Sequence, residues 1–321
     1  MSALILRLPT RIGPRRGLGP VATDVRGDLY GPYEHLFQVG RAAEISGLHG
    51  VLAADTVDGE EPWTVVSGAL RHSRHLHGVV EFSPAFATPV YAAKLSATLQ
   101  RSSGSRLGWR VVPDGDPTER AARGDHLTDA EALRRADEFL TVAKGVWHER
   151  PYTFDGEFYR VLDGGLGHPL PGGVFPRVHT CGTDTGTLAL AAKHADVHLI
   201  GADADIDAIR ADLNARAAAH GRRVALGLEL SLSIRHVGQD DAPPDDVTGR
   251  WDGFADLGHE VPHGLVGTPD ELAAELADLS RRGVSVFVVE VRPALSEAYR
   301  LGEHLLPALE THTSKEAGIV R

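Results

Sequence analysis

The chain has 321 residues, of which 42% are hydrophobic and 24% are charged, so it can bury a sizeable core as one large domain or two small ones. Its formal net charge of −11 excludes nucleic acid and anionic membrane surfaces as expected partners, because both would repel it. The single cysteine, Cys181, excludes an internal disulfide framework. No stretch resembles a signal peptide or approaches the ~20 apolar residues of a spanning helix, so we expect a cytoplasmic protein.

Strand-like and helix-like segments alternate in the first third of the chain. Apolar residues at helical spacing predict helices at 36–47 and 91–103. Short apolar runs that end at turn residues predict strands at 3–8, 50–56, 76–84 and 106–113. This alternation favours a parallel sheet with crossover helices over an all-α or all-β fold.

The rest of the chain continues the alternation, with clearer signals at the ends of elements. Thr128 and Glu131 form a capping box that opens a helix, and 152–161 predicts a hairpin with Asp155 and Gly156 at its turn. A second capped helix begins at Thr268. Further strands are predicted at 177–181, 224–234 and 283–291.

The whole pattern contains eight strand–helix units and no linker. It predicts the α/β class and a (β/α)8 TIM barrel, with residues 1–321 as a single domain. The segment 237–263, rich in Asp, Gly and Pro, is predicted as a long irregular loop between strands seven and eight.

The stretch "TCGTDTG" at 180–186 is predicted to leave a strand, turn, and open an alanine-rich helix. Free backbone N–H groups and the positive end of the helix dipole meet at such a turn, which favours binding of an anion such as phosphate. The alternative is a helix cap without a ligand, because Thr and Asp are preferred capping residues in any context.

Four longer stretches carry a family resemblance: "SPAFATPVYAAKLSATLQRSSGSRLGWRVVPDGDP" (83–117), "RADEFLTVAKGVW" (135–147), "TCGTDTGTLALAAKHADVHLI" (180–200) and the region 264–309. They resemble the bacterial luciferase-like monooxygenases, and within them the alkanesulfonate monooxygenase branch. The resemblance implies a luciferase-like (β/α)8 barrel, oligomeric assembly, and use of reduced FMN delivered by a separate flavin reductase, with molecular oxygen as the second substrate.

The resemblance also implies a function for the turn at 182–185. It implies that Gly182, Thr183, Asp184 and Thr185 bind the FMN phosphate. Asp184 would repel a phosphate unless its carboxylate points away and caps the helix.

Several positions depart from the pattern of the alkanesulfonate branch. The resemblance implies a cysteine at Gly59, an arginine and a histidine at Glu229 and Ser231, and a tyrosine at Arg292. On the flavin side it implies an asparagine at Arg110, and a histidine and a tyrosine at Asp129 and Leu133. The long lid of relatives is reduced to 237–263. Sulfonate cleavage by the usual residues is therefore not expected.

The candidate catalytic residues lie at the C-terminal ends of predicted strands. Alternation along 224–234 directs Glu229 and Ser231 into the barrel, and Glu290 and Arg292 share a face at the end of the last strand. We predict Glu229, Arg292 and Asp55 as catalytic residues that bind a polar substrate or act as acid or base. The alternatives are structural ion pairs for the first two and capping for Asp55.

Three further features have the chemistry of a site. Arg110 is predicted to contact flavin or a substrate phosphate, or else to pair with a barrel acid. His72, His75 and His77 have metal-ligand chemistry, but they lead into a strand from its N-terminal side, so no metal is expected. Cys181 is expected to be a packing residue.

The sequence therefore predicts a flavin-dependent monooxygenase that acts on a small organic substrate. One alternative is a catalytically degenerate subunit that pairs with an active homologue in a heterodimer, because so many expected positions differ. Another is a deazaflavin-dependent oxidoreductase. A homo-oligomer is expected if the chain acts alone.

Overall fold

A computed structural model describes residues 2–11, 32–113, 115–167, 173–235, 243–244 and 247–318. Eight strands follow one another in the order β1, β2, β3, β4, β7, β8, β9 and β12, and β12 pairs again with β1. They form a closed parallel barrel with helices between the strands. The predicted (β/α)8 fold is confirmed.

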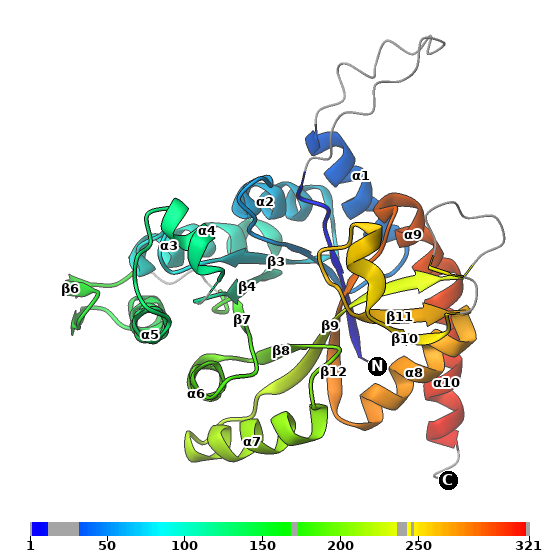
Figure 1. The fold of residues 1–321 in the computed structure, drawn as a ribbon. Helices are drawn as coiled ribbons and strands as arrows, with labels where there is room; N and C mark the ends of the chain where they lie inside the picture. The colour runs from blue at the N-terminus through cyan, green and yellow to red at the C-terminus, as the bar shows by residue number, and fades with distance from the viewer. Residues whose placement is uncertain are drawn as a thin grey trace. The chain divides into compact units, whose positions relative to one another are not determined.

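The chain divides into two compact units, and the first contains residues 1–78, 201–203 and 228–321. Figure 1 shows its strands β1 and β12 side by side, in parallel register from Ala3 opposite Val286. Its elements are β1 (Ala3–Arg7), α1 (Pro32–Ile45), β2 (Gly50–Ala53), α2 (Pro62–His72), β10 (Gly249–Trp251), the 3-10 helix η2 (Gly253–Leu257), β11 (Gly264–Gly267), α8 (Pro269–Arg281), β12 (Val284–Glu290), α9 (Ala294–Arg300), the π-helical turn η3 (Leu301–Leu305) and α10 (Leu306–Gly318), with most of β9 (Ala225–Ile234).

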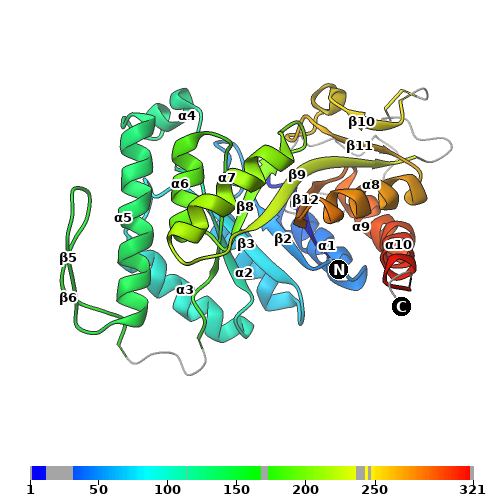
Figure 2. The same ribbon diagram turned by 90° about the horizontal axis from the view of Figure 1, so that it is seen from below.

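The second unit contains residues 79–200 and 204–227. In Figure 2 its short hairpin of β5 and β6 lies alongside the long helix α5. Its elements are most of β3 (His77–Phe82), α3 (Pro89–Ser103), β4 (Leu107–Val111), α4 (Pro117–Ala122), α5 (Asp129–His148), β5 (Tyr152–Asp155), β6 (Arg160–Gly164), β7 (Arg177–Cys181), α6 (Thr185–His194), most of β8 (Val197–Gly201) and α7 (Ile206–Ala219).

Local signals in the sequence account for several element ends. The predicted capping boxes are confirmed, because Thr128 caps α5 and Thr268 caps α8, each with a glutamate three residues later. Helix α3 ends at Gly104, whose left-handed φ of 70° suits glycine. The predicted hairpin is also present, with β5 antiparallel to β6, but Asp155 pairs with Arg160 inside the ladder, so the turn lies at 156–159 and not at Asp155 and Gly156.

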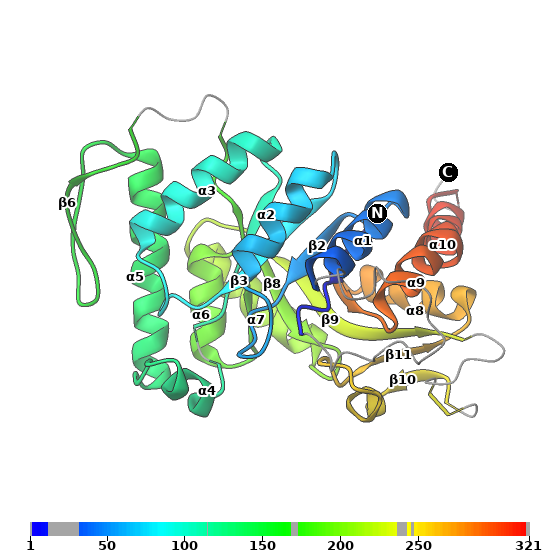
Figure 3. The ribbon, with the colours of Figure 1, turned by 90° about the horizontal axis from the view of Figure 1, so that it is seen from above.

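The segment that follows β9 contains regular structure where an irregular loop was predicted. Residues 237–242 and 245–246 lie outside the described residues, but β10 and η2 fall within the rest of 237–263. Strand β10 pairs antiparallel with β11, and β11 pairs parallel with the C-terminal half of β9, as Figure 3 shows. Pairing with a neighbouring strand, rather than local propensity, therefore orders this segment.

Each unit has its own apolar core. In the second unit Trp109 on β4 packs edge-on against Phe82, with ring centroids 5.3 Å apart, and against Phe175 at 5.0 Å. In the first unit the buried face of β9 and the run Val286–Val289 on β12 are almost wholly inaccessible to solvent. Among the described residues no helix has the length and apolarity needed to cross a membrane.

Candidate active site

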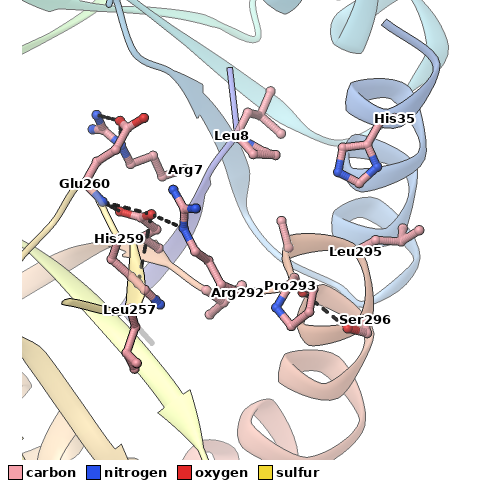
Figure 4. A pocket seen from close by; sticks show the side chains of 14 residues that line it. Arg7, Leu8, His35, Leu257, His259, Glu260, Arg292, Pro293, Leu295 and Ser296 are labelled. Atoms are coloured by element: carbon pink, nitrogen blue, oxygen red, sulfur yellow. Dashed lines mark hydrogen bonds and ion pairs between the residues drawn. The ribbon is translucent and has the colours of Figure 1, made fainter. Parts of the chain in front are cut away.

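A pocket of about 560 Å³ lies in the first unit, at the C-terminal ends of β1 and β12. The segment between η2 and β11 supplies part of its wall, and α1 and the start of α9 supply the rest. In Figure 4, Arg7, His259, Glu260 and Arg292 lie on one side of it, and His35, Leu295 and Ser296 lie on the other. The C-terminal ends of barrel strands are where catalytic residues of this fold class are found.

Arg7 forms ion pairs with two carboxylates at this edge. Its Nη1 donates to Glu229 Oε1 at 2.8 Å, and its Nη2 donates to Glu260 Oε2 at 2.6 Å. All three side chains are at most 15% exposed, so little solvent screens the charges. Glu229, which was predicted as a catalytic residue, therefore forms an ion pair. Its partner is Arg7, which is not among the residues predicted from the sequence.

Glu290, the last residue of β12, is held by main-chain and side-chain donors. Its carboxylate accepts hydrogen bonds from the backbone N–H groups of Glu260 and Val261, each at 2.9 Å to Oε2. Arg292 Nε donates to Glu290 Oε1 at 3.0 Å. Arg292 is 41% exposed while Glu290 is 7% exposed, so the pair joins a buried anion to an accessible cation. These bonds attach the segment before β11 to the end of β12.

His259 and Ser231 form a second group in the pocket wall. Ser231 Oγ donates to the carbonyl oxygen of Val261 at 2.7 Å and lies 2.8 Å from His259 Nδ1. Burial, with Arg292 adding to the effect, lowers the pKa of His259 to about 4. Ser231 stands where the resemblance implies a histidine, and an imidazole from the following segment bonds to it. The sequence analysis missed His259, because it lies in the stretch that carried no structural signal.

Asp55 is placed differently from the other catalytic candidates. It is half-buried and lies two residues after the end of β2, but the residues that line the pocket do not include it. The structure therefore brings Arg292 to the pocket and Glu229 to its Arg7 edge, and does not bring Asp55 there.

The turn at 182–185 belongs to the second unit. Asp184 caps α6: its Oδ1 accepts from the backbone N–H groups of Gly186 at 2.8 Å and Thr187 at 3.1 Å, and these bonds lower its pKa against the opposing effect of burial. The carboxylate thus points into the helix, as a phosphate at the turn requires. Thr183 and Thr185 are exposed, and no described residue bonds their hydroxyl groups.

A buried histidine fixes the shape of this turn. His198 Nε2 lies 2.7 Å from the carbonyl oxygen of Gly182, which can only accept, so Nε2 carries the proton. Its Nδ1 then accepts from the Thr180 hydroxyl at 2.9 Å. Gly182 has a φ of 119°, and a Cβ there would lie 2.7 Å from Thr187 Oγ1. Only glycine fits this position without strain.

Helix α5 begins beside the turn. A Cβ on Gly186 would lie 2.6 Å from Leu133 Cδ1, so the first turns of α5 and α6 are in contact. Asp129, at the start of α5, accepts from Arg120 Nη2 at 2.5 Å. Arg120 is 7% exposed, and its Nε and Nη1 have no hydrogen-bond partner in the described part of the chain. The sequence analysis did not single out Arg120.

Arg110 on β4 forms a buried pair. Its Nε lies 3.1 Å from Glu81 Oε2 on β3, and neither residue is more than 9% exposed. This arrangement matches the alternative in which Arg110 pairs with a barrel acid, while contact with flavin stays a prediction. Cys181 is half-buried, and among the described residues no three His, Cys, Asp or Glu side chains are grouped so that they could hold a metal ion.

Comparisons with known proteins agree with this architecture. A family model described as "Luciferase-like monooxygenase" matches residues 8–243. An EDTA monooxygenase from Chelativorans sp. BNC1 superposes with a TM-score of 0.76 at 18% identity, over 97% of this chain and 94% of that one. A riboflavin lyase solved with modified FMN and riboflavin gives 0.74 at 18% identity, over 98% and 92%. An F420-dependent secondary alcohol dehydrogenase solved with an F420–acetone adduct gives 0.73 at 16% identity, over 96% and 99%. At these identities the likeness shows the fold.

Proposed function

The chain belongs to the luciferase-like monooxygenase family and is an oxidoreductase of that class, and from this premise we propose that it uses reduced FMN and molecular oxygen to oxygenate a small organic substrate. The observation that carries the proposal is the turn at 182–185, where the side chain of Asp184 is withdrawn into α6 and two threonine hydroxyls remain exposed. The proposal also includes descent from the alkanesulfonate monooxygenase branch, a separate flavin reductase as the source of reduced FMN, and assembly as a homo-oligomer.

The residues at the turn fit a phosphate group. Backbone N–H groups at the start of a helix and hydroxyl donors are the usual ligands of phosphate in proteins. Gly182, Thr183 and Thr185 would hold it, and the buried cation of Arg120 would offset the charge of Asp129. When bound, reduced FMN supplies the electrons that activate oxygen.

The pocket at β1 and β12 fits the substrate. Its apolar lining comes mainly from leucine, proline and valine residues, and its polar lining comprises Arg292 and His259 together with Arg7, His35, Glu260, Glu290 and Ser296. Glu229 and Glu260 both pair with Arg7, and Glu260 also lies 3.5 Å from Arg11 Nε, so we assign the two carboxylates a structural part in holding the pocket wall. Arg292 is the candidate that contacts substrate, because it is charged, accessible and at the pocket surface.

An anaerobic titration of the purified protein with reduced FMN tests the cofactor. We expect micromolar binding that is abolished in Thr183→Glu, because the added carboxylate repels the phosphate. Thr311→Glu, at an exposed threonine on α10, is the matched control and should bind FMN as the wild type does.

The same titration with reduced F420 tests the deazaflavin alternative, which the likeness to the F420-dependent dehydrogenase favours. Tighter binding of F420 than of FMN would replace FMN in the proposal. Failure to bind either cofactor would favour the degenerate subunit.

A further inference from the structure

A chain of hydrogen bonds sets the proton on the His259 ring. The Ser231 hydroxyl has one proton and donates it to the Val261 carbonyl at 2.7 Å, since that oxygen can only accept. At 2.8 Å from His259 Nδ1 the Ser231 oxygen must then accept, so Nδ1 carries the ring proton. The other nitrogen, Nε2, is left with a lone pair.

The surroundings of His259 keep the ring neutral near pH 7. The residue is 9% exposed, its ring packs on Phe254 with centroids 4.9 Å apart, and Arg292 opposes a positive charge on it. Glu290 Oε1 lies 3.9 Å from Nδ1, but that carboxylate is already engaged by Arg292 and two backbone N–H groups. The ring therefore offers an acceptor, and no second donor.

Nε2 is the ring nitrogen that remains for a bound molecule. No described residue forms a hydrogen bond with it, and His259 lines the pocket. An imidazole acceptor without a partner in the described part of the chain favours a ligand that carries an O–H or N–H group at that point, because an acceptor left unpaired by the ligand costs binding energy.

Arg292 offers the complementary group. Its Nε is used by Glu290, and no described residue bonds its two outer nitrogens, Nη1 and Nη2. A guanidinium with two free nitrogens on one edge matches the two oxygens of a carboxylate. Its partner Glu290 touches both groups, at 3.0 Å from Arg292 Nε and 3.9 Å from His259 Nδ1, so donor and acceptor lie close together in the wall.

We propose that this pocket selects a small hydroxylated organic acid, whose carboxylate lies on the outer edge of Arg292 and whose hydroxyl group donates to His259 Nε2. Leu8, Pro9, Leu257 and Leu295 enclose the apolar body of the molecule, as Figure 4 shows for three of them. The proposal rests on the proposed function, because it names the substrate class of that same site. Ser231 is a positioning residue in it, since it acts through His259.

The first experiment determines the tautomer and the protonation state of the His259 imidazole in the absence of flavin. In protein labelled with 15N-histidine, the signals of His259 are those that disappear in His259→Phe. We expect the Nδ1–H tautomer from pH 6 to 8, and loss of the single tautomer in Ser231→Ala, which keeps the ring. An Nε2–H tautomer, or titration of His259 near 6.5, would overturn the proposal.

The second experiment measures binding by calorimetry, with 2-hydroxybenzoate and 4-hydroxybenzoate as probes and benzoate as the reference. We expect at least one hydroxybenzoate to bind about tenfold more tightly than benzoate, which is the ratio of dissociation constants expected for one additional hydrogen bond. His259→Phe should remove that preference while benzoate binding stays. Arg292→Gln should weaken all three probes, and His220→Phe, at an exposed histidine, should change none.

Equal binding of benzoate and both hydroxybenzoates to the wild type, or no binding of any, would contradict the proposed substrate class. Because neither experiment contains flavin, these results are independent of the FMN titration. A protein that binds FMN but shows no hydroxyl preference would refute this inference alone.

Discussion

Arg7 Nη1 lies 2.8 Å from Glu229 Oε1, so the carboxylate that the sequence marked as catalytic is one half of an ion pair in the barrel wall. The same guanidinium holds Glu260, which lies next to His259 in the chain. Arg7 therefore links β1, β9 and the segment before β11. We expect its replacement to lower the stability of the fold more than it changes the reaction.

We predict that Arg7→Met lowers the free energy of unfolding by about 3 kcal/mol, because it removes the closest charge partner of two nearly buried carboxylates. Urea denaturation measures the change. Arg210→Met is the control: Arg210 pairs with Asp207 at the surface, where it is 41% exposed, and the loss should stay below about 0.5 kcal/mol. A similar small loss for Arg7→Met would show that the pair contributes little to the wall.

Stability should rise with pH between about 4 and 6.5. Burial lowers the pKa of both His259 and His179 to about 4, below the ordinary histidine value, so the unfolded chain binds more protons in this window. As pH falls, protonation therefore favours the unfolded state. Urea midpoints at pH 4.5, 5.5, 6.5 and 7.5 should give this slope, and His259→Gln should reduce it, whereas His220→Gln should not. A flat profile would contradict neutral, buried imidazoles.

Replacing Asp184 by asparagine separates capping from charge. Asparagine caps helices as well as aspartate does, so we expect the free energy of unfolding to change by less than about 0.5 kcal/mol. Removal of the negative charge beside the turn should tighten binding of reduced FMN several-fold. The measurement is the anaerobic FMN titration, and weaker binding in Asp184→Asn would argue against a phosphate at this turn.

Arg120→Met tests the buried cation beside α5. We expect reduced FMN to bind about tenfold more weakly, because the guanidinium no longer offsets Asp129 near the phosphate. Arg134→Met is the matched control, since Arg134 pairs with Glu157 at the surface of the same helix region and is 53% exposed. Equal FMN affinity in both variants would remove Arg120 from the cofactor site.

The sequence predicted the fold where local patterns carry it. Alternation along β9 placed Glu229 and Ser231 on one side of the strand, and the capping residues Thr128 and Thr268 gave the starts of two helices. Such signals depend on neighbours a few residues away, which a single sequence displays directly.

The ion pairs and hydrogen bonds of the pocket wall could not be predicted from such local patterns. Arg7 and Glu229 are 222 positions apart, and Arg7 and Glu260 are 253 apart, so only the closed barrel brings them together. His259 was missed for a related reason. Its segment has no periodic pattern, and its order comes from the pairing of β10 with β11 and from the bonds to Glu290. One signal was available for Arg7, a charge at the end of the otherwise apolar run "ALILRL".

The Glu290 carboxylate bonds to the backbone N–H groups of residues 260 and 261, and these bonds do not involve the side chains of the two residues. An evolving lineage could therefore exchange almost any amino acid at position 261 and keep this attachment, whereas the side chain at position 260 also pairs with Arg7. Proline is the exception, since it has no N–H to give. The rim of the pocket is thus open to variation in chemistry while its attachment point remains constant.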